Sequence, residues 1–185
     1  MTDKRDLLIL GGGLVGMTLA LAAAKKGLSS HLVDRADPAS LTAEGFDGRA
    51  RAFVQIQQGC DHRCTFCIVP YVRGPEKNRD PLEILNEVRD LVTRGVTEVT
   101  LLGQTVNSYT FADLSFPNLL SEIAQVEGIR RVRFTSPHPN DVTPELVEVM
   151  ATEPAVCEHL HLPAQSGNNR TLKRMLRRYT VEILL

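Results

Sequence analysis

Residues 59–67 read GCDHRCTFC, a stretch that places three cysteines in a C-x3-C-x2-C spacing. The preceding segment 52–57 (AFVQIQ) alternates between apolar and polar residues, so the cysteines are expected on a loop just after a strand. These residues, Cys60, Cys64 and Cys67, are three of the four cysteines in the 185-residue chain. Such crowding favours a metal site in a reducing compartment over a disulfide framework.

Three thiolates at this spacing hold three irons of a [4Fe–4S] cluster and leave the fourth iron open. S-adenosylmethionine can chelate that iron through its amino and carboxylate groups, and one-electron reduction then cleaves the sulfonium. The spacing therefore predicts a radical SAM site, with the cluster and S-adenosylmethionine as cofactors. Phe66, just before the third cysteine, is expected beside the adenine of S-adenosylmethionine.

A zinc-stapled binding module is the alternative, although structural zinc sites usually contain paired C-x2–4-C units or histidine. The fourth zinc ligand would then come from Cys157, His159, His161 or His62. Without zinc, Cys157 is expected to be a small buried thiol and His62 a solvated loop residue.

Helical and strand patterns alternate along the rest of the chain. Helices are predicted at 81–94, 117–127, 143–151 and from about Asn168, and strands at 97–103, 130–136 and 156–162. Together with the strand before the cysteines, this alternation predicts an α/β fold, namely a partial, four-stranded radical SAM (β/α) barrel.

The predicted strands each carry an apolar face and a polar face. The apolar faces are expected to meet the helices. The opposite faces would line the barrel with Gln55, Gln57, Glu98, Thr100, Arg131, Arg133, His159 and His161. Because an unpaired buried charge is costly, Glu98 is expected to pair with Arg131 or Arg133. An ordinary two-layer sheet with one wet face is the alternative.

The first fifty residues have a different pattern. Residues 6–10 (DLLIL) predict a buried strand, 17–26 a helix and 30–34 (SHLVD) a second strand. The glycines between the first strand and the helix match G-x-G-x-x-G, and an acidic residue ends the second strand; these are Gly11, Gly13, Gly16 and Asp34. This order predicts a Rossmann-like βαβ fragment that binds a dinucleotide pyrophosphate at the helix N-terminus and a ribose at the acid.

Residues 1–50 also resemble the start of FAD-dependent hydroxylases of ubiquinone biosynthesis. The matching runs are LILGGGLVGMTLALAAAKKGL at 8–28, LVDR at 32–35 and FDGRA at 46–50. The alternative function is therefore a fragment of an FAD-dependent monooxygenase. One βαβ unit cannot enclose a flavin, so we do not expect FAD to bind and interpret the motif as vestigial. The predicted domains are 1–50 and 51–185.

Residues 51–180 resemble the radical SAM core of tRNA methylthiotransferases, in particular the branch that makes 2-methylthio-N6-dimethylallyladenosine. The matching runs are QGCDHRCTFCIVPYVRG at 58–74, LLGQTVNSY at 101–109, RVRFTSPHP at 131–139 and HLHLPAQSGN at 159–168. The resemblance implies methylthiolation of an isopentenylated adenosine beside the tRNA anticodon, with the anticodon loop as the partner.

The resemblance also indicates contacts to S-adenosylmethionine. Gly103 and Gln104 match the place where the superfamily contacts the methionine amino group. Ser136 and Gln165, at the ends of later strands, are either partners of the methionine carboxylate or ribose, or ordinary turn residues.

A basic segment follows the last predicted strand. Its cations are Arg170, Lys173, Arg174, Arg177 and Arg178. They are expected either to contact tRNA phosphates or to form a solvated helix face.

The composition limits the other function classes. A net charge of -1 argues against a broad electrostatic grip on nucleic acid, and the sequence contains no run of about 20 apolar residues, so we expect a cytoplasmic protein. No cysteine precedes Cys60, whereas methylthiotransferases carry a second cluster in an N-terminal domain. We therefore expect a fusion of two fragments that does not insert sulfur by itself.

Overall fold

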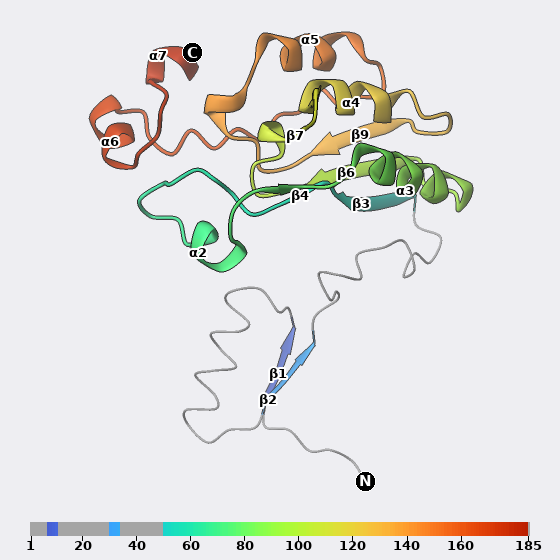
Figure 1. The fold of residues 1–185 in the computed structure, drawn as a ribbon, viewed down its shortest axis with the longest axis horizontal. Helices are drawn as coiled ribbons and strands as arrows, with labels where there is room; N and C mark the ends of the chain where they lie inside the picture. Colours follow the sequence, from blue (N-terminus) through green and yellow to red (C-terminus); the bar gives the residue numbers. More distant parts are fainter. Residues whose placement is uncertain (1–6, 11–29, 34–49, 185) are drawn as a thin grey trace. The chain divides into compact units, whose positions relative to one another are not determined.

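The computed structural model describes residues 7–10, 30–33 and 50–184. The chain divides into two compact units, Met1–Glu44 and Gly45–Leu185. Each unit is described by itself below (Figure 1).

The first unit contains a parallel pair of strands. Strand β1 (Leu7–Leu10) pairs with β2 (Ser30–Val33), with Leu7 opposite Ser30 and Leu10 opposite Val33. Both predicted strands are thus confirmed. The glycine motif at Gly11, Gly13 and Gly16, the helix predicted at 17–26 and Asp34 lie outside the described residues.

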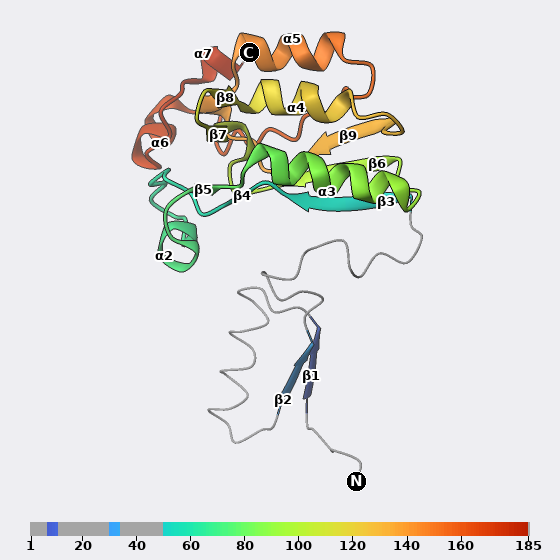
Figure 2. The ribbon, with the colours of Figure 1, turned by 45° about the vertical axis from the view of Figure 1, so that its right-hand side comes forward.

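The second unit is built on a parallel three-stranded sheet in the order β3-β6-β9. Its strands are β3 (Arg51–Gln55), β6 (Glu98–Leu102) and β9 (Arg131–Phe134). Three helices lie on one face of this sheet: α3 (Pro81–Thr93), α4 (Phe116–Ala124) and α5 (Pro144–Thr152) (Figures 1 and 2). Strand–helix alternation with a parallel sheet confirms the predicted α/β fold class.

Short elements fill the connections. They are β4 (Gln57–Gln58) paired with β5 (Lys77–Asn78), α2 (Val69–Arg73), η2 (Val106–Ser108), β7 (Thr110–Phe111) paired with β8 (Leu114–Ser115), η3 (Pro139–Asp141), α6 (Asn169–Arg174) and α7 (Val181–Leu184).

The hydrophobic core lies between the sheet and the helices. Val54, Val99, Leu101 and Val132 on the apolar face of the strands are fully buried. Helix α3 starts at Pro81, and its N-cap Asp80 accepts a 2.8 Å hydrogen bond from the Leu82 amide. The core-facing residues of α3 and α4 recur at helical spacing. They are Ile84, Leu85, Val88, Leu91, Leu119, Leu120 and Ile123, and all are buried.

Glu98 occupies the opposite face of the sheet, as its alternation with Val99 predicts. Its side chain is 3% exposed and pairs with the Nε atoms of Arg131, Arg133 (3.0 Å) and Arg51 (3.5 Å). The predicted pairing of Glu98 is therefore confirmed, with both arginines as partners. The hydrogen bond from Arg131 is the main cause that lowers the pKa of Glu98, and it outweighs the opposing effect of burial.

The predicted fourth strand at 156–162 is reduced to one parallel bridge between Val132 and Val156. The Cys157 amide donates to the Val132 carbonyl, but the His159 amide turns back to the Cys157 carbonyl at 2.7 Å and leaves the ladder. The strand-face assignment of His159 and His161 is therefore wrong, since both residues are exposed in a loop.

The predicted basic helix is also shorter than expected. Asn168 caps α6 by accepting a 3.2 Å hydrogen bond from the Thr171 amide, and the helix ends at Arg174. Leu176 has a positive φ of 56°, which turns the chain, so Arg177 and Arg178 lie beyond the helix.

No helix in the described part of the chain has the length and apolar character that crossing a membrane requires.

We predict that Glu98→Gln lowers the free energy of unfolding by about 1–2 kcal/mol, because it leaves the paired arginines without their shared carboxylate. The loss of stability stays modest because the arginines are partly exposed and water screens their charge. Urea denaturation measures it, with the exposed Glu158→Gln as the matched control. Equal stabilities of the two variants would contradict a structural role for the Glu98 ion pairs.

Candidate metal centre

The cysteine loop begins at a glycine that no other residue could replace without a shift of backbone. Gly59 has a φ of +81°, and a Cβ atom there would lie 2.1 Å from the Pro75 carbonyl oxygen. Its amide donates a 2.6 Å hydrogen bond to Gln104 Oε1, and the Cys60 amide donates to the Gly74 carbonyl at 3.2 Å. The first contact attaches the start of the loop to a residue that follows β6, and the second attaches it to the residue that follows α2.

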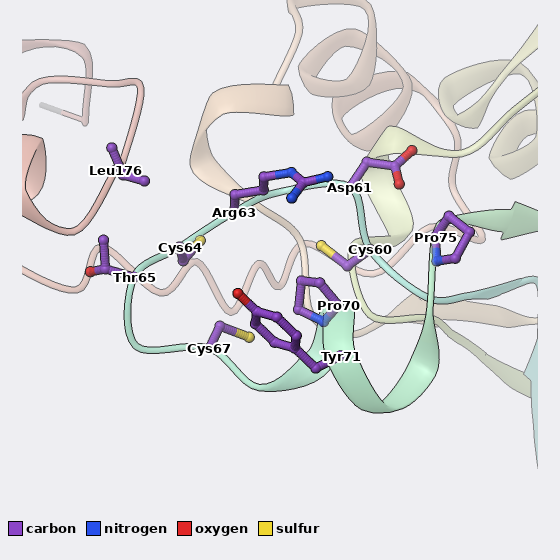
Figure 3. A pocket seen from close by; sticks show the side chains of 10 residues that line it. All are labelled: Cys60, Asp61, Arg63, Cys64, Thr65, Cys67, Pro70, Tyr71, Pro75 and Leu176. Carbon is purple, nitrogen blue, oxygen red and sulfur yellow. The ribbon is translucent and has the colours of Figure 1, made fainter.

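The three cysteines of the loop share one cavity. Cys60 is buried, Cys64 and Cys67 are partly exposed, and all three are free thiols. The Cys67 amide donates to the Cys64 carbonyl at 3.0 Å, a turn that brings these two residues to the same side. Figure 3 shows the three sulfurs facing a common space. This cavity of 590 Å³ is lined by Cys60, Asp61, Arg63, Cys64, Thr65, Cys67, Pro70, Tyr71, Pro75 and Leu176.

The electrostatics of the cavity disfavour the ionised form of Cys64 in the absence of a metal. Burial raises the pKa of the Cys64 thiol; nearby Cys67 and Cys60 raise it further, against the lowering effect of Arg177. Neighbouring thiolates repel one another, and iron relieves this repulsion because it binds sulfur in its ionised form. The donor set therefore fits a metal cluster.

One residue after β6 that the sequence patterns did not single out, Thr105, supports the first cysteine. The Cys60 sulfur lies 3.1 Å from Thr105 Oγ1, and the Thr105 amide donates to Gln57 Oε1 at 2.9 Å. Gln57 is 1% exposed and also donates to Ser108 Oγ. The run of polar residues after the predicted strand at 97–103 could have identified Thr105 as a residue of the site.

None of the five predicted S-adenosylmethionine contacts lines the cavity; these are Phe66, Gly103, Gln104, Ser136 and Gln165. Gln104 binds the Gly59 amide, and a Cβ atom on Gly103 would lie 2.9 Å from Gln57 Oε1. Phe66 is 54% exposed. Ser136 and Gln165 have positive φ values of 58° and 67°, unusual for residues other than glycine.

His62, between the first two cysteines, is anchored rather than solvated. Its ring stacks on His138 with centroids 3.9 Å apart and planes 11° apart, and its Nε2 lies 2.7 Å from Asp141 Oδ2. His138 is 8% exposed, and its backbone is held by hydrogen bonds in both directions with the Asn107 side chain. The sequence-based expectation of a solvated His62 is therefore wrong.

The same three groups, His62, His138 and Asp141, could offer ligand atoms within 4.8 Å of one another. A metal ion bound by a histidine lies in the plane of the imidazole ring, however, and two stacked rings have planes that do not meet at a common ion. This geometry favours a packing role for the cluster of side chains.

The far side of the loop is held by the last residue of α6 and the segment that follows it. The Thr65 amide donates to the Met175 carbonyl at 3.2 Å, and Thr65 Oγ1 donates to the Arg174 carbonyl. The Arg177 guanidinium lies over the ring of Phe66 at 5.6 Å and over that of Tyr179 at 6.0 Å. The cysteine loop therefore rests on residues that follow β6, residues that follow β9 and the C-terminal segment together.

Comparison with known proteins agrees with this site. Residues 54–185 match the family model of the Radical SAM superfamily. The chain belongs to the radical SAM superfamily. Its described strands β3, β6 and β9 therefore form part of a radical SAM domain.

Curated relatives of this radical SAM chain are similar over the same region. It is 53% identical over 139 residues to the tRNA-2-methylthio-N(6)-dimethylallyladenosine synthase of Geobacter sulfurreducens, covering 74% of the chain and 31% of that relative. The enzyme of the same name from Moorella thermoacetica is 53% identical over 136 residues, covering 72% of the chain and 31% of the relative. The chain thus spans about a third of the length of these relatives.

Solved structures share the fold of the radical SAM unit. The radical S-adenosylmethionine methyltransferase TsrM from Kitasatospora setae, with cobalamin and a [4Fe-4S] cluster bound, has a TM-score of 0.57 at 18% identity, over 71% of this chain and 27% of TsrM. The cobalamin-dependent S-adenosylmethionine radical enzyme OxsB has a TM-score of 0.55 at 16% identity, over 71% and 21% of the two chains.

The N-terminal residues of the radical SAM chain are similar to a different family. Residues 6–53 match the FAD binding domain model, which ends where the radical SAM match begins.

We predict that Gln104→Ala lowers the free energy of unfolding of the cofactor-free chain by about 1 kcal/mol, because the Gly59 amide loses its acceptor. Gln104→Glu keeps an oxygen at this place and should retain most of the stability. Urea denaturation of both variants tests this. Wild-type stability of Gln104→Ala would mean that the side chain does not support the loop.

A second prediction concerns pH. Burial is the main cause that lowers the pKa of His138 to about 4, from an ordinary value of 6.5, so the folded chain keeps this ring neutral while the unfolded chain takes up a proton. The resulting stability is complete above about pH 6.5 and falls as the pH decreases toward 4, by about 2–3 kcal/mol.

His138→Phe keeps a ring at this place and lacks the titration, so its stability should vary less over this interval. Urea denaturation at a series of pH values compares the two chains, and the exposed His161→Phe serves as the control. Parallel pH profiles of wild type and His138→Phe would refute the assignment.

Proposed function

We propose that residues 51–185 are the catalytic core of a tRNA methylthiotransferase that binds a [4Fe–4S] cluster and S-adenosylmethionine. The observation that carries the proposal is the presence of three free thiols around one cavity, in a chain 53% identical to synthases of 2-methylthio-N6-dimethylallyladenosine. By this proposal the reaction is methylthiolation of an isopentenylated adenosine next to the anticodon.

Cys60, Cys64 and Cys67 would hold the cluster as three thiolate ligands. The bound cluster would supply the electron that cleaves S-adenosylmethionine reductively. Other side chains of the site position the cysteines and shield the cavity from water. Thr105 holds the Cys60 sulfur in place, while Pro70 and Tyr71 cover one side of the cavity.

The predicted contacts to S-adenosylmethionine remain part of the proposal. Ser136 and Gln165 follow β9 and the Val156 bridge, and both have left-handed backbone conformations. Such strained residues are found preferentially at ligand and active sites, which supports a role in binding the cofactor. Phe66, Gly103 and Gln104 complete the proposed set, with Gln104 acting through the loop that it anchors.

Positive charge for an RNA substrate is concentrated near the C-terminal end. Arg170, Lys173, Arg174 and Arg178 are exposed, and Arg177 is partly exposed. Phosphate contacts from such a segment are independent of sequence, whereas recognition of a specific base favours unstacked loops such as the anticodon loop.

We assign residues 1–50 to a separate Rossmann-like domain. The parallel pair β1–β2 and the FAD binding domain match to residues 6–53 support a separate N-terminal domain. Binding of FAD by this domain is a second candidate function, and it predicts a yellow protein with a flavin absorption spectrum.

We predict that the anaerobically reconstituted chain acquires an iron–sulfur absorption band and about four irons, and that it releases 5′-deoxyadenosine from S-adenosylmethionine under reducing conditions. Alanine at Cys60, Cys64 or Cys67 should remove most of the bound iron and the cleavage, since each residue supplies a ligand. Cys157→Ala is the matched control and should retain both.

Stoichiometric zinc in a colourless protein would overturn the proposal in favour of a structural metal site. Retention of iron in all three cysteine variants would overturn the ligand assignment.

A further inference from the structure

A second cavity adjoins the cysteine cavity and is lined by cations. It has a volume of 270 Å³, and its lining residues are Asp61, His62, Arg63, Lys173, Leu176, Arg177 and Arg178. Three of these, Asp61, Arg63 and Leu176, also line the cysteine cavity, so the two spaces are neighbours. Figure 3 shows Arg63 and Leu176 on the side of the cysteine cavity where Cys64 lies.

The cations of this second cavity come from two separate parts of the chain. Arg63 belongs to the cysteine loop, and Lys173, Arg177 and Arg178 belong to α6 and the turn after it. Two hydrogen bonds from Thr65 to the carbonyls of Met175 and Arg174 hold these two segments together. The gathering of charge is therefore a product of the fold and not of one basic helix face.

The positive charge is largely uncompensated. Within residues 50–184, Arg63, Lys173, Arg177 and Arg178 form no ion pair with a carboxylate. The single acid in the lining, Asp61, accepts a hydrogen bond from the Glu76 amide. Like charges so close together repel one another, and a bound anion removes that repulsion.

Arg177 has a further property of an anion-binding residue. Its guanidinium is held by the rings of Phe66 and Tyr179, and its Nε is buried without a hydrogen-bond acceptor. Aromatic rings fix the orientation of an arginine without occupying its N–H donors, so the remaining N–H groups of Arg177, which lines the cavity, can bind a ligand.

We propose that this cavity binds a backbone phosphate of the RNA substrate, next to the nucleotide that enters the cysteine cavity. The inference rests on the proposed function and deepens it. A phosphate bound in one defined pocket fixes which nucleotide of the RNA lies at the cysteine cavity. A phosphate anchored beside the cysteine cavity positions the neighbouring base for reaction. Arg170 and Arg174 lie on the same basic segment but do not line the cavity, so they contribute only general attraction.

The test compares two double variants that remove the same net charge. Lys173→Ala/Arg178→Ala removes two cations of the cavity, and Arg170→Ala/Arg174→Ala removes two outside it. Binding of a fluorescein-labelled anticodon stem-loop RNA to the full chain is followed by fluorescence anisotropy at several KCl concentrations. Circular dichroism confirms that each variant folds.

We expect the cavity variant to bind about tenfold more weakly and its salt dependence to fall by about one unit of slope, as for the loss of a phosphate contact. Arg63→Ala, from the other segment, should show the same change. The outer variant should change affinity by about twofold or less.

Three results would overturn the inference: equal weakening by both double variants, absence of RNA binding by the wild-type chain, or competition with RNA by S-adenosylmethionine but not by inorganic phosphate. The last result would assign the cavity to the cofactor carboxylate. Iron content and 5′-deoxyadenosine release are measured on the same wild-type preparation. If iron and 5′-deoxyadenosine release are present but the two double variants bind RNA equally, only the phosphate pocket is refuted. If iron and 5′-deoxyadenosine release are absent, the proposed function is refuted.

Discussion

The site requires three cysteines of one irregular loop to face a common cavity. Cys60, Cys64 and Cys67 sit on a loop that has no regular secondary structure up to α2. The loop must therefore be held from outside, and the structure provides this support at three places. Gln104 and Thr105 hold its start, His138 and Asp141 hold its middle through His62, and the 174–175 carbonyls hold Thr65.

Strand β6 connects the stability of the sheet with the position of the site. At its start, Glu98 joins the three strands through Arg51, Arg131 and Arg133. After its end, Gln104 and Thr105 contact the cysteine loop. The carboxyl ends of parallel strands meet at one edge of a sheet, so residues after β3, β6 and β9 converge there. This is why the loop, the Gln104–Thr105 pair and His138 lie together although they are far apart in sequence.

The chain joins two family matches that meet between residues 53 and 54. The first residues of β3 thus lie within the FAD binding domain match and its last residues within the radical SAM match. Across this junction the strand keeps its alternation, since Phe53 is 66% exposed and Val54 is fully buried.

Features that depend on local patterns could be predicted from the order of the residues alone. Cysteine spacing identified the metal loop, and alternation along 98–102 and 131–134 identified strand faces. The cost of an unpaired buried charge predicted the pairing of Glu98. Tertiary structure decided what depends on distant partners. The hydrogen bond from Gly59 to Gln104 spans 45 residues and the His62–Asp141 contact spans 79. Likewise, the turn at His159 ended the fourth strand, and the turn at Leu176 carried Arg177 and Arg178 away from α6 to meet Arg63. Periodicity reports only which side of an element a residue occupies, whereas these contacts arise from the packing of separate elements against one another.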